Sequence, residues 1–90
     1  MSSQSDGWSI ERVREVAVRV AAALAPVQPQ AGAQLADAAG LVASDAEALL
    51  VIRSALVATR DEWEMLPSHE LVAEARAALS AGKRLAIELE

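Results

Sequence analysis

Residues 44–66 read SDAEALLVIRSALVATRDEWEML. From residue 46 to residue 58 only Glu47, Arg53 and Ser54 are polar, so a helix here is apolar around almost its whole circumference. A helix of this kind is normally covered by other elements on more than one side. The segment therefore predicts a central helix that the rest of the chain surrounds.

The start of this central helix carries a capping signal. Ser44 and Glu47 form an S-x-x-E pattern, in which the serine side chain accepts a hydrogen bond from a backbone N–H and the glutamate reaches back to the cap residue. We expect the helix to span residues 45–65.

A second helix is expected before the central one, over residues 9–25. Ser9 is a favourable N-cap, and Pro26 ends the helix because proline forces the preceding residue out of the helical region. The apolar residues between them recur at alternating spacings of three and four and share one helical face: Ile10, Val13, Ala17, Val20 and Leu24.

Two more helices complete the expected bundle. A proline suited to a first helical position and a glycine suited to a C-terminal cap bound a short helix over residues 29–39. After Pro67, a helix is expected over residues 68–88. Gly82 is a possible stop, after which residues 84–90, RLAIELE, alternate as a strand does. A lone strand would have no partner here, so we expect the helix to continue.

The predicted fold class is therefore all-α, a small single-domain bundle of four helices. The chain has 90 residues, which is too few for two ordinary domains of about 100 to 200 residues. The small polar residues 1–7, MSSQSDG, are expected to form a disordered tail, and residues 8–90 the single helical domain.

Composition excludes several classes of protein and partner. The chain has no cysteine, so thiolate metal sites and cysteine nucleophiles are absent, and a reducing cytoplasm is the expected location. No segment has the length and apolarity of a membrane helix, and residues 1–7 lack the basic residues of a secretory signal. The net charge of −5 repels nucleic acids and anionic lipids, so neither nucleic acid nor membrane is an expected partner. Arginine outnumbers lysine seven to one and alanine is abundant, which favours a bacterial origin.

The sequence contains no recognisable catalytic or metal-binding pattern. His69 is the single histidine and lacks a second histidine at helical spacing, so a helical zinc motif is excluded and an exposed side chain is expected. The four glycines never fall at the spacing of a phosphate-binding loop. We therefore expect no enzyme activity, no cofactor, no metal and no small-molecule substrate.

Residues 61–66, DEWEML, conflict with a continuous helix over residues 45–65. Three carboxylates would crowd its last turns, where the helix dipole disfavours negative charge. Three explanations remain open. The helix ends near Arg60 and a separate helical turn begins at Asp61; or Trp63 and Leu66 with the flanking acids form a contact surface for a basic, partly apolar partner; or Trp63 lies in the core.

The apolar circumference of the central helix points to an interface. Unless the four helices cover it in a tight alanine-rich bundle, the uncovered part contacts another protein or a second copy of the chain. Arg53 is expected either to bury its stem with the guanidinium in water or to pair with a partner's carboxylate. The predicted partner-binding residues are Leu50, Arg53, Val57, Asp61, Glu62, Trp63, Glu64 and Leu66.

The expected function is a non-enzymatic protein-interaction module, an accessory, adaptor or regulatory subunit of a larger bacterial protein or complex. An acidic antitoxin that masks a basic toxin is one form of it. In length, acidity and expected helix number the chain is similar to acyl carrier proteins, whose phosphopantetheine is carried by a serine at a helix start. Ser44 has this setting, although Ala43, Ser44 and Asp45 stand where the family has Asp-Ser-Leu. The resemblance implies an alternative, an acyl-carrier-like domain with a modified serine.

Overall fold

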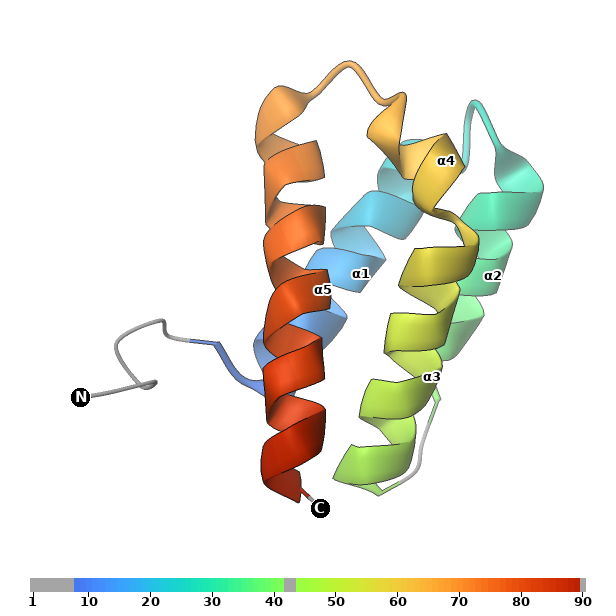
Figure 1. The fold of residues 1–90 in the computed structure, drawn as a ribbon. Helices are drawn as coiled ribbons and strands as arrows, with labels where there is room; N and C mark the ends of the chain where they lie inside the picture. The colour runs from blue at the N-terminus through green and yellow to red at the C-terminus, as the bar shows by residue number, and fades with distance from the viewer. Residues whose placement is uncertain (1–7, 42–43, 90) are drawn as a thin grey trace.

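Five helices form the described part of the chain, residues 8–41 and 44–89, in the computed structural model (Figure 1). This part of the chain is all-helical, as the periodicity predicts. The predicted tail over residues 1–7 lies outside the described residues. The helices are α1 (Ile10–Leu24), α2 (Pro29–Ala39), α3 (Asp45–Ala58), α4 (Arg60–Glu64) and α5 (His69–Leu89).

Serine side chains cap three of these helices where the sequence predicts helix starts. The hydroxyl oxygen of Ser9 accepts from the backbone N–H of Arg12 at 3.2 Å. Ser44 accepts from the N–H of Glu47 at 3.3 Å, and Ser68 serves α5 in the same way. Each cap satisfies one of the backbone donors that a helix start leaves without a partner.

Helix α3 lies at the front of the bundle in Figure 1, between α5 and α2, with α1 behind it. It contacts all four other helices, as expected of a central helix. The core between them is built from large side chains of α3 and α4 that pack against the apolar face of α1: Val13, Val16, Val20, Leu24, Leu49, Ile52, Leu56 and Trp63.

Helices α1 and α2 approach each other closely at Gly32. A Cβ atom at this buried position would lie 3.0 Å from the carbonyl oxygen of Ala21 and 3.0 Å from the backbone nitrogen of Ala25. Because real Cβ atoms rarely come that close to backbone, any larger residue here would require the backbone of α1 to shift. The glycine that weakens α2 as an isolated helix is therefore what allows it to dock.

The predicted helix over residues 45–65 is wrong in one respect: it is two helices, so the bundle has five rather than four in the described ranges. The hydroxyl of Thr59 donates to the carbonyl of Ala55 at 2.7 Å, and the indole N–H of Trp63 donates to the carbonyl of Leu56 at 2.9 Å. The carbonyl of Ala55 also accepts from the backbone N–H of Thr59 at 3.0 Å, whereas that of Leu56 is satisfied by the Trp63 indole. Asp61 then lies in the first turn of α4, where the helix dipole favours a carboxylate.

Helix α5 passes through Gly82 without interruption, so the expectation of a helix rather than a strand after this residue is confirmed as far as Leu89. Gly82 is buried, and a Cβ atom there would lie 2.8 Å from Cγ of Arg53. The glycine therefore makes room for the arginine stem between α3 and α5.

Candidate interaction surface

The outer side of α3 exposes three large apolar side chains. Leu50 is 59% exposed, Val57 58% and Val51 37%, whereas Leu49, Ile52 and Leu56 on the opposite side are fully buried. Because α3 is apolar all round, the direction of its buried face follows from the helices around it rather than from its own pattern. We call the outer surface formed by Leu50, Val51, Arg53, Ser54, Val57 and Ala58 the α3 face.

Two shallow hollows lie side by side on the α3 face. The first, of about 330 Å³, adjoins Arg53 and is lined by Leu50, Arg53, Ser54, Val57 and Ala58. The second, of about 440 Å³, lies towards α2 and is lined by Gln34, Asp37, Ala38, Leu41, Val51, Ser54, Ala55 and Ala58. Ser54 and Ala58 line both hollows, so these two small residues form a low crest between them.

The two hollows carry opposite charges at their outer sides. Arg53 extends towards α5, with its stem against Gly82, and its Nε atom is buried without a hydrogen-bond partner in the described structure. Asp37, on α2, is exposed at the other side of the crest. The α3 face is therefore an apolar strip with a cation on its α5 side and a carboxylate on its α2 side.

The structure brings together three of the predicted partner-binding residues, Leu50, Arg53 and Val57, in the first hollow. Trp63, at 0% exposure, and Leu66, at 8%, lie in the core and present no contact surface. The explanation that placed Trp63 in the core is confirmed by this burial. The aromatic and its neighbouring acids do not form one exposed patch.

The predicted acidic residues take separate positions on α4. Glu64 accepts from Nε of Arg60 at 2.9 Å and from Nε of Arg76 at 3.3 Å, so it ties α4 to α5. The hydrogen bond from Arg60 is the main cause that lowers the pKa of Glu64; partial desolvation opposes it, and Arg76 adds to the lowering. Asp61 is exposed and Glu62 half-buried, and neither lines the hollows of the α3 face.

Sequence reasoning missed the residues of α2 and the small residues of the crest. Gln34, Asp37 and Leu41 join the surface only because α2 packs beside α3, and nothing local in the sequence indicates that. A signal for Ser54 does exist. Positions 47, 50, 54 and 57 follow one another at spacings of three, four and three, which places them on one side of a helix.

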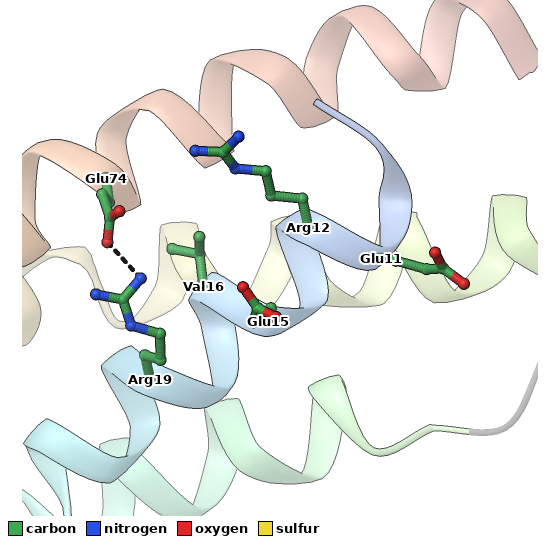
Figure 2. Close-up of a pocket in the computed structure, with 6 residues that line it drawn as sticks. All are labelled: Glu11, Arg12, Glu15, Val16, Arg19 and Glu74. Carbon is green, nitrogen blue, oxygen red and sulfur yellow. Dashed lines mark ion pairs between the residues drawn. The ribbon is translucent and has the colours of Figure 1, made fainter. Parts of the chain in front are cut away.

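A third hollow, of about 340 Å³, lies between α1 and α5 and is lined by charged residues with Val16 at its base (Figure 2). Nη1 of Arg19 and Oε1 of Glu74 form an ion pair at 2.6 Å across the two helices. The guanidinium of Arg12 lies 4.6 Å from the centre of the Trp8 ring. Figure 2 shows Glu11 at the opposite end of the hollow from that ion pair, with Glu15 between them. The Arg19–Glu74 ion pair in this hollow connects α1 with α5.

The structure also places the metal-ligating residue types and the helix-cap serine of α3. Among the described residues, no group of three or more histidine, cysteine, aspartate or glutamate side chains is placed to hold a metal ion. His69 is exposed at the start of α5. The hydroxyl of Ser44 is exposed and acts as the cap of α3, a role that accounts for this serine at a helix start.

In the described part of the chain, no helix combines the length and apolarity needed to cross a membrane. Comparison with protein-family models, with curated proteins and with solved structures finds no match for the chain. The argument about function therefore depends on the surface itself.

Proposed function

We propose that this protein is a non-enzymatic helical interaction module and that the α3 face is its contact surface. The observation that supports this most directly is the exposure of Leu50 and Val57 on a helix whose other side is fully buried. Burying such a side chain is worth about 1.5 to 3 kcal/mol, and the isolated chain forgoes most of that. A partner that covers the α3 face would recover it.

The module would act as an accessory, adaptor or regulatory subunit in a bacterial cytoplasm. The absence of cysteine and the arginine-rich, alanine-rich composition support this location and origin. Its net charge of −5 suits a protein partner better than a nucleic acid. An antitoxin-like role, in which the acidic chain covers a basic protein, belongs to the same proposal.

The test compares Leu50 with Val18, two apolar residues that are similarly exposed but lie on different helices. Leu50→Glu places a charge in the α3 face, whereas Val18→Glu does so on α1, where the side chain is 50% exposed. Both variants should keep the helical content and melting behaviour of the parent, because neither residue is in the core.

The measurement is native mass spectrometry of the tagged chain purified from the cells in which it occurs. We expect the parent and Val18→Glu to carry the same stoichiometric companion, which is either another protein or a second copy, and Leu50→Glu to lose it. Equal complexes for all three chains would refute the assignment of the α3 face. A parent chain that is monomeric and alone would refute the proposed function.

A further inference from the structure

The α3 face has the spacing of a helix-pairing seam. Leu50 and Val57 are seven residues apart with Ser54 between them, so large, small and large side chains follow one line along α3. Alternating steps of three and four are the spacing by which two helices pack side by side over several turns. The small Ser54 allows the two backbones to approach closely at the middle of the seam.

The charges beside the seam distinguish between two ways of pairing α3 with itself. A twofold axis perpendicular to α3 makes the helices antiparallel and brings the α5 side of one copy against the α5 side of the other. Arg53 then faces a second Arg53, and Asp37 a second Asp37, which costs free energy because like charges oppose one another across an interface.

A twofold axis along α3 makes the helices parallel and brings the α5 side of each copy against the α2 side of the other. Arg53 then faces Asp37 of the second copy, and the pairing occurs twice. Glu47, at the N-terminal end of the same line of residues, faces Glu47 of the second copy, so one like-charge contact opposes two ion pairs. Arg53 of one copy and Asp37 of the other also lie at matching positions along the helix axis. In a parallel pair, a side chain that directly precedes a seam residue, as Arg53 precedes Ser54, points towards the residue five positions later in the other helix. For Arg53 that position is Ala58, which lines the hollow containing Asp37.

Both charged groups are available for such a pair. The stem of Arg53 is held against Gly82, and its buried Nε has no partner in the described structure. Neither Arg53 nor Asp37 forms an ion pair with another described residue. An arginine whose stem is packed in this way loses less freedom when its guanidinium meets a carboxylate, and such hydrogen bonds are among the stronger ones in proteins.

We propose that the occupant of the α3 face is a second copy of this chain, with the two α3 helices parallel about a twofold axis and Arg53 of each copy paired with Asp37 of the other. This inference rests on the proposed function and names its partner. A standard interface buries about 800 Å² per partner. The total surface of the chain is 5443 Å², and the α3 face belongs to a single helix of 14 residues. The dimer interface should therefore be small, and the dimer should dissociate on dilution.

Charge reversal tests the pairing in the purified full-length chain. Sedimentation from micromolar to millimolar concentration should show a reversible dimer for the parent. Arg53→Glu and Asp37→Arg should each shift it towards monomer, and the double variant should restore it. Glu70→Arg makes the same change of charge as Asp37→Arg at an exposed site outside the hollows and should leave the dimer unchanged.

A disulfide tests the direction of the helices, because the natural chain has no cysteine. In the parallel arrangement Val57 meets Val57 of the second copy, so Val57→Cys should form a covalent dimer on mild oxidation, whereas Val18→Cys should not. In an antiparallel pair centred between residues 53 and 54, the two positions would be about 10 Å apart along the helices. That exceeds the Cα separation of about 7 Å that a disulfide can bridge.

Three outcomes would overturn the inference: a parent that remains monomeric up to millimolar concentration, a double variant that fails to restore the dimer, or a Val57→Cys chain that does not cross-link. If the purified parent is monomeric but Leu50→Glu still removes a different protein from the complex in cells, the second copy is excluded as the occupant and the proposed function is kept. If the purified parent is monomeric and Leu50→Glu also leaves the complex in cells unchanged, both proposals are refuted.

Discussion

Gly32→Ala should force α1 and α2 apart. The added methyl carbon would lie 3.0 Å from the carbonyl oxygen of Ala21, 3.0 Å from the nitrogen of Ala25 and 3.2 Å from its Cα. All three are backbone atoms, so no side-chain rotation can relieve the contact. The backbone of α1 would have to shift by a few tenths of an ångström, which loosens its packing against the rest of the core.

The expected loss of stability follows from two opposing effects. Adding a methylene-sized group to a well-packed core costs about 1 to 3 kcal/mol, and rigid backbone on several sides favours the upper part of that range. Replacing glycine by alanine inside a helix contributes about 1 kcal/mol in the other direction. The net destabilisation should be about 1 to 2 kcal/mol, which lowers the melting temperature of a domain of this size by about 4 to 16 °C.

Gly40→Ala is the matched control, because it makes the same chemical change at the end of the same helix. Gly40 has φ −88° and ψ −1°, which alanine adopts without strain, and its added Cβ would be 3.4 Å from the nearest atom outside its neighbours. This variant should gain about 0.4 to 1 kcal/mol through the reduced freedom of the unfolded chain.

Thermal and urea unfolding followed by circular dichroism measure both variants. The reasoning predicts shifts of opposite sign for Gly32→Ala and Gly40→Ala. If Gly32→Ala were stabilised as much as Gly40→Ala, the close approach of α1 and α2 would not exist in solution, and the explanation of Gly32 as a docking residue would be refuted.

Two further predictions concern the junction of α3, α4 and α5. Trp63→Phe removes the donor to the carbonyl of Leu56 and should lower the free energy of unfolding, measured in urea, by about 1 to 3 kcal/mol. Trp8→Phe changes a half-buried ring and should cost less. Equal losses would contradict the capping role of Trp63. Glu64→Gln tests the lowered carboxyl pKa. Because that pKa is lower in the folded chain than the ordinary value of 4.5, the carboxylate stabilises the fold above about pH 4.5, and this contribution is lost as the pH falls through the folded value. The stability difference between the parent and Glu64→Gln should therefore be constant near neutral pH and shrink in acid, and a difference independent of pH would contradict the ion pairs with Arg60 and Arg76.

Local sequence signals were sufficient for most of the helices and their starts. Alternating spacings of three and four located α1, serine caps located the first turns of α1 and α3, and Pro67 located the start of α5. These signals work because a cap involves residues only three positions apart. The division at Thr59 was visible as a conflict between the helix dipole and the acids that follow. The sequence left the position of this break open because the hydrogen bond from the indole of Trp63 to the carbonyl of Leu56 depends on how α4 packs against the end of α3.

The candidate surface was only partly predictable for the same reason. Leu50, Arg53 and Val57 were expected on it and share a hollow, but Trp63 was also expected there and is buried. A helix that is apolar on all sides does not indicate in its own sequence which side will be covered. Composition and periodicity determined that the chain forms helices with more apolar surface than the bundle buries. The packing of α1, α2 and α5 around α3 decided which part of that surface stays exposed and placed Asp37 beside it, because those positions depend on contacts between residues distant in the chain.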